Sequence, residues 1–307
     1  MKFIWRCYTI YGRGVVINMV TINNLRVAYG DKVALSITDS LTFEEGDRIG
    51  IIGSNGAGKT TLVKSILGVT PYKGSITTSL RQDEMAVHLQ ENNYVDSMPI
   101  RYIIEGVLNK SIKKDKKLQD LIQFFDMDGC LNKKFSALSG GQKQRMTIIL
   151  VLLQDAKLTF FDEVTSGLDF ETRQQLIHKL QEWYQAKGAT ICMVSHYYEE
   201  LDHFVNKILI LDEGKVIDFG TKEELFRKYC QHAIIILDNT PGNQEITKWY
   251  DKIAAPEHLI ALVCQNEKAE IAIMQNLIEH DINFKRSNRD IEIMSINALQ
   301  GGGKHAY

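Results

Sequence analysis

The sequence has few of the features that mark membrane-spanning, secreted or metal-cluster proteins. No stretch approaches the roughly 18 uninterrupted apolar residues of a transmembrane helix. The five cysteines are scattered and form no CxxC pair, which argues against a disulfide framework or a metal cluster and favours a reducing compartment. The formal net charge is -2, so no excess of positive charge indicates nucleic acid as the main partner.

The chain contains enough apolar residues to form two hydrophobic cores. Its 307 residues, 44% hydrophobic and 24% charged, are typical of a globular protein with one large domain and one smaller one. Met19 stands directly before the first strand pattern, and no small-residue cleavage site follows the apolar, lightly basic start. We therefore expect residues 1–18 to be an extension outside the folded domain and not a signal peptide.

The order of the predicted elements indicates an α/β fold. From Met19 to about Cys230, short apolar strands alternate with helical patterns, which predicts a mainly parallel sheet covered on both faces. Residues 231–300 are expected to form a small C-terminal α/β domain, and residues 301–307 a tail. The predicted elements of that small domain are strands at Ala233–Leu237, Leu259–Val263 and Ile291–Ile296 and helices at Ile246–Ile253 and Lys268–Ile278.

The most informative loop is Gly53–Thr60, with the sequence GSNGAGKT, which fits the P-loop pattern G-x-x-x-x-G-K-[ST]. It follows a buried strand and opens a helix, as a phosphate-binding loop requires. The glycines let backbone N–H groups surround phosphate oxygens, and the helix adds its positive N-terminal end. Lys59 is expected to reach the β- and γ-phosphates, and the Thr60 hydroxyl to hold Mg²⁺.

A second nucleotide element follows the apolar strand Leu158–Phe161, which ends in Asp162 and Glu163. Parallel sheets bind ligands at the carboxyl ends of their strands, where this acidic pair would lie. Asp162 is expected to bind Mg²⁺, and Glu163 to act on the attacking water as general base. Alone, an apolar run ending in Asp-Glu is usually a strand meeting solvent. Together with the P-loop, it predicts a Walker B element.

The segment Leu138–Gln142 (LSGGQ) precedes a helix that the pattern begins at about Gln142. Ser139 is a suitable N-cap, and the following glycines let backbone amides approach an anion. Physical reasoning alone favours a simple capped helix start. The longer segment Leu138–Arg145 (LSGGQKQR), however, resembles the signature motif of ABC ATPases, and it is the most specific signal in the chain.

The resemblance covers about residues 19–230 and implies a fold: a P-loop NTPase domain of the ABC type, with a mainly parallel sheet, an antiparallel β subdomain and a short helical subdomain. Tyr29 resembles the aromatic residue that stacks on adenine, and Gln90 the Q-loop glutamine. Asp169 ends a segment that resembles the D-loop, and His196 resembles the switch histidine that contacts the γ-phosphate.

The resemblance also implies three sets of site residues. The catalytic set is Glu163, His196, Gln90 and Lys59. Mg²⁺ is expected at Thr60, Gln90 and Asp162. The residues expected to contact ATP are Tyr29, Gly53, Ser54, Asn55, Gly56, Ala57, Gly58, Lys59, Thr60, Thr61, Ser139, Gly140, Gly141, Gln142 and Asp169.

In ABC ATPases the signature turn of one subunit contacts the ATP held by another subunit. The resemblance therefore implies a second ATPase subunit, in a homodimer or heterodimer, and a separate transmembrane permease subunit. We expect no nucleic-acid partner, and a cytoplasmic location on the inner face of the cell membrane through the permease. The short segment between Gln90 and Leu138, the segment SHYYEELD and the C-terminal domain resemble bacitracin- and lantibiotic-type exporters. Export of a peptide, antibiotic or lipid-like compound is the prediction.

Two other functions remain open at this point. One is a soluble ABC ATPase that acts on a partner unrelated to transport. The single P-loop and single signature count against the two-cassette translation type, and the short spacing between them leaves no room for the coiled coil of the DNA-repair type. The other is a nucleotide-binding regulatory subunit without hydrolysis, against which Glu163 and His196 count.

Overall fold

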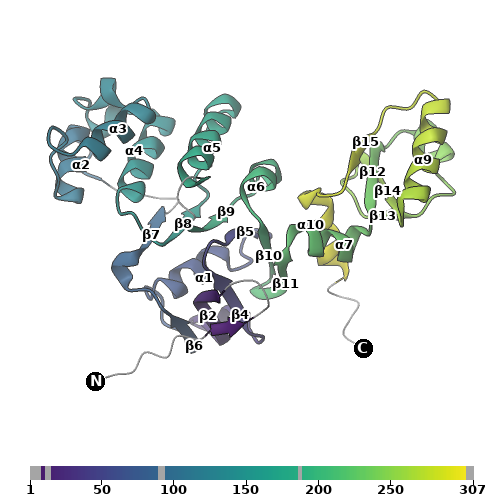
Figure 1. Ribbon diagram of the computed structural model, residues 1–307, viewed down its shortest axis with the longest axis horizontal. Coiled ribbons are helices and arrows are strands. Elements are labelled where there is room, and N and C mark those ends of the chain that lie inside the picture. Colours follow the sequence, from purple (N-terminus) through teal and green to yellow (C-terminus); the bar gives the residue numbers. More distant parts are fainter. Residues whose placement is uncertain (1–7, 11–14, 89–93, 186–188, 302–307) are drawn as a thin grey trace.

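The computed structural model describes residues 8–10, 15–88, 94–185 and 189–301. Figure 1 shows a large α/β domain and, at the other end of the molecule, a smaller domain, with α7 and α10 between them. The α/β fold with mixed sheets agrees with the sequence prediction. Within the described ranges, no helix is both long and apolar enough to cross a membrane.

The centre of the large domain is a six-stranded sheet of order β11-β10-β5-β9-β8-β7. The five strands from β10 to β7 run parallel, and β11 pairs antiparallel with β10. The sequence prediction of a mainly parallel sheet is thereby confirmed. The strands are β5 (Arg48–Ile52), β7 (Met85–His88), β8 (Leu158–Asp162), β9 (Thr190–Val194), β10 (Lys207–Asp212) and β11 (Lys215–Thr221).

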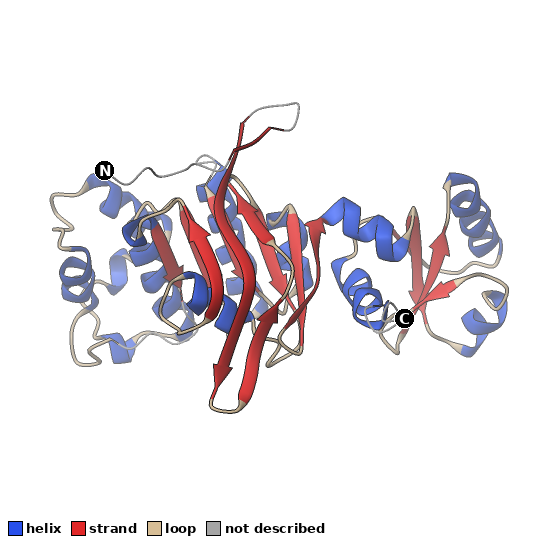
Figure 2. Cartoon of the chain, turned by 90° about the horizontal axis from the view of Figure 1, so that it is seen from below, coloured by secondary structure: helices blue, strands red, loops and turns tan. Residues whose placement is uncertain are grey.

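An antiparallel sheet lies against this centre, and its long strand β2 pairs with each of its other four strands (Figure 2). Aliphatic and aromatic residues of β2, β3 and β4 are buried in one core together with the apolar side of α1. This sheet is the antiparallel β subdomain that the resemblance implies. Its strands are β1 (Tyr8–Ile10), β2 (Val15–Tyr29), β3 (Lys32–Ile37), β4 (Leu41–Glu44) and β6 (Lys73–Thr78).

Helices cover both faces of the central sheet because successive strand residues point to opposite sides. Phe160 belongs to the core that α1 covers, whereas its neighbour Phe161 belongs to the core that α4, α5 and α6 cover. Helices α2 and α3 pack on α4 as a short helical subdomain. The helices are α1 (Lys59–Ile66), α2 (Ile100–Leu108), α3 (Lys116–Phe124), α4 (Gly140–Leu152), α5 (Phe170–Gln185), α6 (Tyr198–Phe204) and α7 (Lys222–Cys230), with 3-10 turns at Gln82–Glu84, Asp128–Cys130 and Phe135–Ala137.

The smaller domain has the element order β-α-β-β-α-β, and its four strands form an antiparallel sheet of order β13-β14-β12-β15. This is the arrangement of the split β-α-β, or ferredoxin-like, motif. Its elements are β12 (Ala233–Asp238), α8 (Pro241–Ile246), β13 (Lys252–Ile253), β14 (Leu259–Cys264), α9 (Glu267–Glu279) and β15 (Lys285–Ser287).

Two predicted elements of the smaller domain are wrong. The segment predicted as strand Ile291–Ile296 lies in helix α10 (Ile291–Gly301), and the predicted helix Ile246–Ile253 is the end of α8, a turn and β13. Helix α10 packs on α6, α7, β10 and β11 of the large domain. Because its Ile291 and Met294 share one core with Ile234 of β12, α10 contributes to both parts of the chain.

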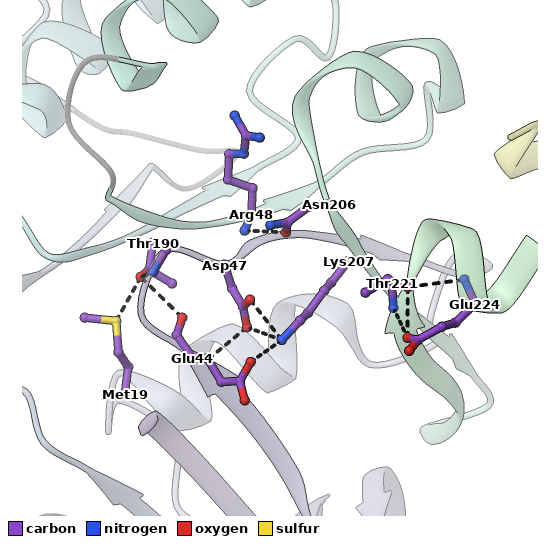
Figure 3. Close-up of polar contacts among 10 residues, drawn as sticks. Met19, Glu44, Asp47, Arg48, Thr190, Asn206, Lys207, Thr221 and Glu224 are labelled. Atoms are coloured by element: carbon purple, nitrogen blue, oxygen red, sulfur yellow. Dashed lines mark hydrogen bonds and ion pairs between the residues drawn. The ribbon is translucent and has the colours of Figure 1, made fainter. Parts of the chain in front are cut away.

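Charged and polar groups tie together the amino ends of the central strands (Figure 3). Lys207 Nζ donates to Glu44 Oε2 at 2.6 Å and to Asp47 Oδ2 at 3.0 Å, and Asp47 is only 5% exposed. The N–H of Arg48 donates to Asn206 Oδ1 at 2.9 Å. These contacts hold the start of β5 against the start of β10. They lie at the amino ends of the strands, and the P-loop lies at the carboxyl ends.

Candidate functional site

The P-loop joins the end of β5 to the start of α1, in a backbone conformation that requires glycine. Gly53 and Gly58 have φ angles of 148° and 96°. A Cβ at Gly53 would lie 2.1 Å from the carbonyl oxygen of Leu211. Helix α1 then begins at Lys59 with no side-chain cap and no acidic residue in its first turn. Its N-terminal amides are therefore able to bind an anion.

Lys59 is buried, and its side chain folds back over the loop. Nζ donates to the carbonyl oxygens of Gly53 at 2.8 Å and Ser54 at 3.0 Å. Burial lowers the pKa of Lys59, although the charges of Glu163 and Asp162 act in the opposite direction. Neutral carbonyl groups do not cancel the ammonium charge, so this lysine can exchange them for phosphate oxygens.

Thr60 and Asp162 meet where α1 begins and β8 ends. The Thr60 hydroxyl donates to Asp162 Oδ2 at 2.7 Å. Burial raises the pKa of Asp162, and the hydrogen bond from Thr60 opposes that shift. A hydroxyl and a carboxylate oxygen are the hard ligands that Mg²⁺ prefers. In the described part of the chain, no group of three or more His, Cys, Asp or Glu side chains could hold a metal ion.

Glu163 and His196 face one another beside this pair. His196 Nε2 lies 3.1 Å from Glu163 Oε1. Glu163 has a positive φ of 50°, and its N–H donates to the carbonyl oxygen of Val194 at 3.0 Å, which holds the turn after β8 against the end of β9. A small cavity of about 60 Å³ adjoins both side chains. It is large enough for water, which a carboxylate at this position could polarise.

The P-loop lines a larger cavity of about 650 Å³, a volume typical of small-ligand sites. Tyr29, which is 53% exposed, lines this cavity, where its ring would be accessible to a base. Lys32 and Glu213 also line this cavity, and no motif in the sequence indicated either of them. The lining residues are Tyr29, Lys32, Val33, Ala34, Asn55, Gly56, Ala57, Gly58, Lys59, Thr60, Thr61, Glu163 and Glu213.

The signature residues line a different cavity, of about 280 Å³. Ser139 caps α4: its Oγ accepts the N–H of Gln142 at 3.3 Å, while Gln142 Oε1 accepts the N–H of Ser139 at 3.2 Å. The helix begins at Gly140, two residues before the predicted start. Asp169 lies in the same cavity, where hydrogen bonds from Thr172 lower the pKa of its carboxyl group.

The structure therefore sorts the predicted residues into two groups. Lys59, Thr60, Asp162, Glu163 and His196 come together at the carboxyl ends of β5, β8 and β9. The residues from Ser139 to Gln142, with Asp169, form a separate group. Gln90 lies outside the described residues.

Comparisons with known proteins agree with this geometry. Residues 38–166 match the family model described as "ABC transporter". The methionine import ATP-binding protein MetN 3 of Bacillus cereus is 26% identical over 312 residues, which cover 92% of this chain and 88% of that protein. The energy-coupling factor transporter ATP-binding protein EcfA1 of Levilactobacillus brevis is 26% identical over 238 residues, 72% of this chain and 85% of that protein.

Solved structures are similar to this chain over about two thirds of its length. An ATP-binding subunit of an ABC transporter superposes with a TM-score of 0.62 at 22% sequence identity. The match covers 69% of this chain and 94% of that chain. At this identity the likeness concerns the fold.

Proposed function

This chain is the ATP-binding, ATP-hydrolysing subunit of an ABC transporter, and from that premise we propose how its residues share the reaction. The P-loop amides and Lys59 bind the phosphates, and the Tyr29 ring stacks on adenine. Glu163 accepts a proton from the attacking water, and His196 contacts the γ-phosphate and orients Glu163. Mg²⁺, held by Thr60 and Asp162 and by the Q-loop residue Gln90, would neutralise charge that develops on the phosphates.

The observation that carries this proposal is the separation of the two cavities. The P-loop cavity contains the groups that bind phosphate, yet none of the signature residues. Ser139, Gly140 and Gly141 therefore act on ATP held by a second ATPase subunit, and each composite site needs two chains. Preorganised donors from the facing signature would stabilise negative charge on the γ-phosphate.

A mixing experiment with two inactive variants tests this arrangement. Gly140→Asp places a carboxylate against the partner's γ-phosphate. A Cβ at Gly140 meets no atom within 4 Å, so the variant should fold. Alone, it should bind ATP through its own P-loop but not hydrolyse it. Mixed with Lys59→Ala, it should recover part of the ATPase activity, because its intact P-loop then faces an intact signature.

The matched control is Gly242→Asp, at a glycine in the smaller domain that also has open space around it. This variant should hydrolyse ATP at the wild-type rate. Recovery on mixing supports action in trans. Activity of Gly140→Asp alone at the wild-type rate would contradict the proposed role of the signature. Because some ABC dimers need two intact sites, cross-linking of the mixed chains must confirm that a mixed dimer forms.

The transport that this ATPase powers requires separate membrane subunits, which would hold the chain at the inner face of the membrane. Export of a peptide, antibiotic or lipid-like compound stays a prediction, since one of the similar proteins is by its name a methionine importer. Reconstitution of the chain with its membrane subunits in vesicles distinguishes the two directions. ATP added to the side that carries the ATPase drives compound away from that side in export and towards it in import. An active ATPase that moves no compound in either direction in these vesicles would favour the soluble alternative.

A further inference from the structure

Glu200 is a buried carboxylate in the first turn of α6, and it contacts three separate segments near the reacting groups. Its Oε2 accepts the hydroxyl of Thr165 at 3.0 Å and the hydroxyl of Ser195 at 3.0 Å. Its Oε1 lies 3.3 Å from Arg173 Nε, and the two side chains are only 2% and 14% exposed. Nothing in the roles assigned above uses this side chain.

The contact with Ser195 holds the turn that carries His196. The Ser195 hydroxyl donates to Glu200 and at the same time accepts the N–H of Tyr197 at 3.0 Å. Ser195 thus bonds to this carboxylate directly, and Tyr197, on the other side of His196, is linked to it through the Ser195 hydroxyl. This fixes the backbone from which the imidazole reaches Glu163.

The contact with Thr165 holds the turn that follows Glu163. The N–H of Ser166 donates to the carbonyl oxygen of Glu163 at 3.0 Å, and the N–H of Leu168 to that of Thr165 at 3.2 Å. The Thr165 side chain, buried to 1% exposure, then anchors this turn to α6. Glu163 and His196 thus approach one another from two turns that share Glu200 as their common partner.

Arg173 connects the same carboxylate to the segment that resembles the D-loop. It lies in the first turn of α5, where its N–H donates to the carbonyl oxygen of Asp169 at 3.0 Å. Its guanidinium carbon lies 3.9 Å from the centre of the Tyr197 ring. A movement of Asp169 would therefore reach the His196 turn through Arg173, both by the ion pair and by the stacked ring.

We propose that Glu200 is a positioning residue for ATP hydrolysis, which sets the mutual geometry of Glu163 and His196 and couples it to the segment ending at Asp169. Misplacement of reacting groups by about 1 Å can reduce a rate by about 100-fold. Burial raises the pKa of Glu200, while hydrogen bonds from Thr165 and Ser195 and the charge of Arg173 oppose this shift. The inference concerns ATP hydrolysis alone and does not depend on the transported compound.

The test is Glu200→Gln, measured by steady-state kinetics of the purified chain. The amide keeps the shape but loses the charge that faces Arg173. We expect kcat to fall by about 10- to 100-fold. The KM for ATP should stay within about 2-fold, because Glu200 contacts none of the P-loop residues. The matched control is Glu199→Gln, an exposed carboxylate one position earlier on the same helix, which should leave both constants unchanged.

A cycle with His196→Ala separates positioning from a merely structural role. If Glu200 acts through His196, Glu200→Gln should reduce the single-turnover rate much less in the His196→Ala chain than in the wild-type chain. Equal reductions in the two backgrounds would overturn the proposal. The proposal would also be overturned if Glu200→Gln lowered only the melting temperature and the folded variant kept the wild-type kcat.

Should Glu200→Gln fail to fold, Ser195→Ala decides the question. This substitution removes one hydroxyl and leaves the pair of Glu200 and Arg173 intact. It should lower kcat, again with little effect in the His196→Ala background. A wild-type kcat for Ser195→Ala, with the protein folded, would contradict the link between Glu200 and His196.

Discussion

The buried Lys59 and the half-buried Lys207 lie at opposite ends of the strands of the central sheet, and their pKa values shift in opposite directions. Burial alone would lower the pKa of Lys207, but hydrogen bonds to Glu44 and Asp47 outweigh it and raise the pKa. At the other end of the strands, burial lowers the pKa of Lys59, and the more distant charges of Glu163 and Asp162 do not compensate. The difference lies in the partners, which are carboxylates for Lys207 and backbone carbonyl groups for Lys59.

The comparison teaches how one kind of side chain serves two purposes in one sheet. At the amino ends of the strands, Lys207 has two carboxylates, those of Glu44 and Asp47, within hydrogen-bond distance. At the carboxyl ends of the strands, the Lys59 ammonium group has neutral carbonyl oxygens as its hydrogen-bond acceptors, and it lies next to the uncapped N-terminus of α1. That arrangement adds little to folding stability and favours an incoming polyanion. The charged group that stabilises the fold thus lies at the amino ends of the strands, and the charged group that binds a ligand lies at their carboxyl ends.

Replacing each lysine in turn tests this difference, and we expect the largest effect from Lys59→Met, on ATP binding and hydrolysis. Each hydrogen bond between a charged lysine and a phosphate is worth roughly 1.5–3 kcal/mol. The variant should bind ATP at least about 10-fold more weakly and lose hydrolysis, while its free energy of unfolding does not fall. Isothermal titration calorimetry and urea unfolding measure the two quantities. Unchanged affinity and turnover would rule out the P-loop assignment.

The same substitution at the amino ends of the strands, Lys207→Met, should lower the free energy of unfolding and leave ATP binding unchanged. It leaves the buried Asp47 carboxylate without its ammonium partner, and removing one member of a buried ion pair is strongly destabilising. We expect a loss of about 2–3 kcal/mol in the free energy of unfolding, less than for a fully buried pair because Lys207 is partly exposed. ATP affinity of the folded fraction should be retained. A loss of affinity without a loss of stability would contradict the division between the two ends of the strands.

A smaller, pH-dependent effect is expected from His88, at the carboxyl end of β7. Burial lowers its pKa to about 4, and neither ring nitrogen has a hydrogen-bond partner among the residues that the structure describes. Between pH 6.5 and 4 the unfolded chain binds more protons at this residue, so the folded state loses stability as the pH falls through that range. From pH 7 to 5 the loss is about 2 kcal/mol.

The control for this effect is His88→Leu, compared with the wild type by urea unfolding at pH 7 and pH 5. The substitution should reduce the difference in unfolding free energy between the two pH values by about 2 kcal/mol. An unchanged difference would show that His88 does not titrate in this way.

Site residues whose chemistry needs a short continuous segment could be predicted from the sequence. A phosphate-binding loop needs its glycines, lysine and threonine at fixed spacing, so Gly53–Thr60 could be identified as a motif. Once that motif was identified, the acidic residues at the end of β8 could be assigned to the same site. The roles of Glu200 and Arg173 were not predictable, because their contacts join two separate stretches of the chain, residues 165–173 and residues 195–200. As a sequence, two glutamates in a short helix look like a solvated face.

Helix α10 was missed for a different physical reason. In Ile291–Ile296 the apolar residues alternate in part with Glu292 and Ser295, which imitates the period of a strand. The segment is a helix because it is buried on two sides at once, by α6 and α7 and by the small sheet. With apolar contacts on both sides, its sequence shows no single amphipathic stripe.

The two-sided burial of α10 sets an order of events during synthesis of the chain. The large domain's own elements end with α7 at Cys230, but the helix that covers the apolar side of α7 begins about 60 residues later. At roughly 5–20 residues per second, translation needs several seconds to produce it. During that interval α7 lacks the contacts that it makes with α10 in the folded chain. A nascent chain paused there would expose this surface to chaperones or to wrong partners, and only the arrival of residues 291–301 closes it.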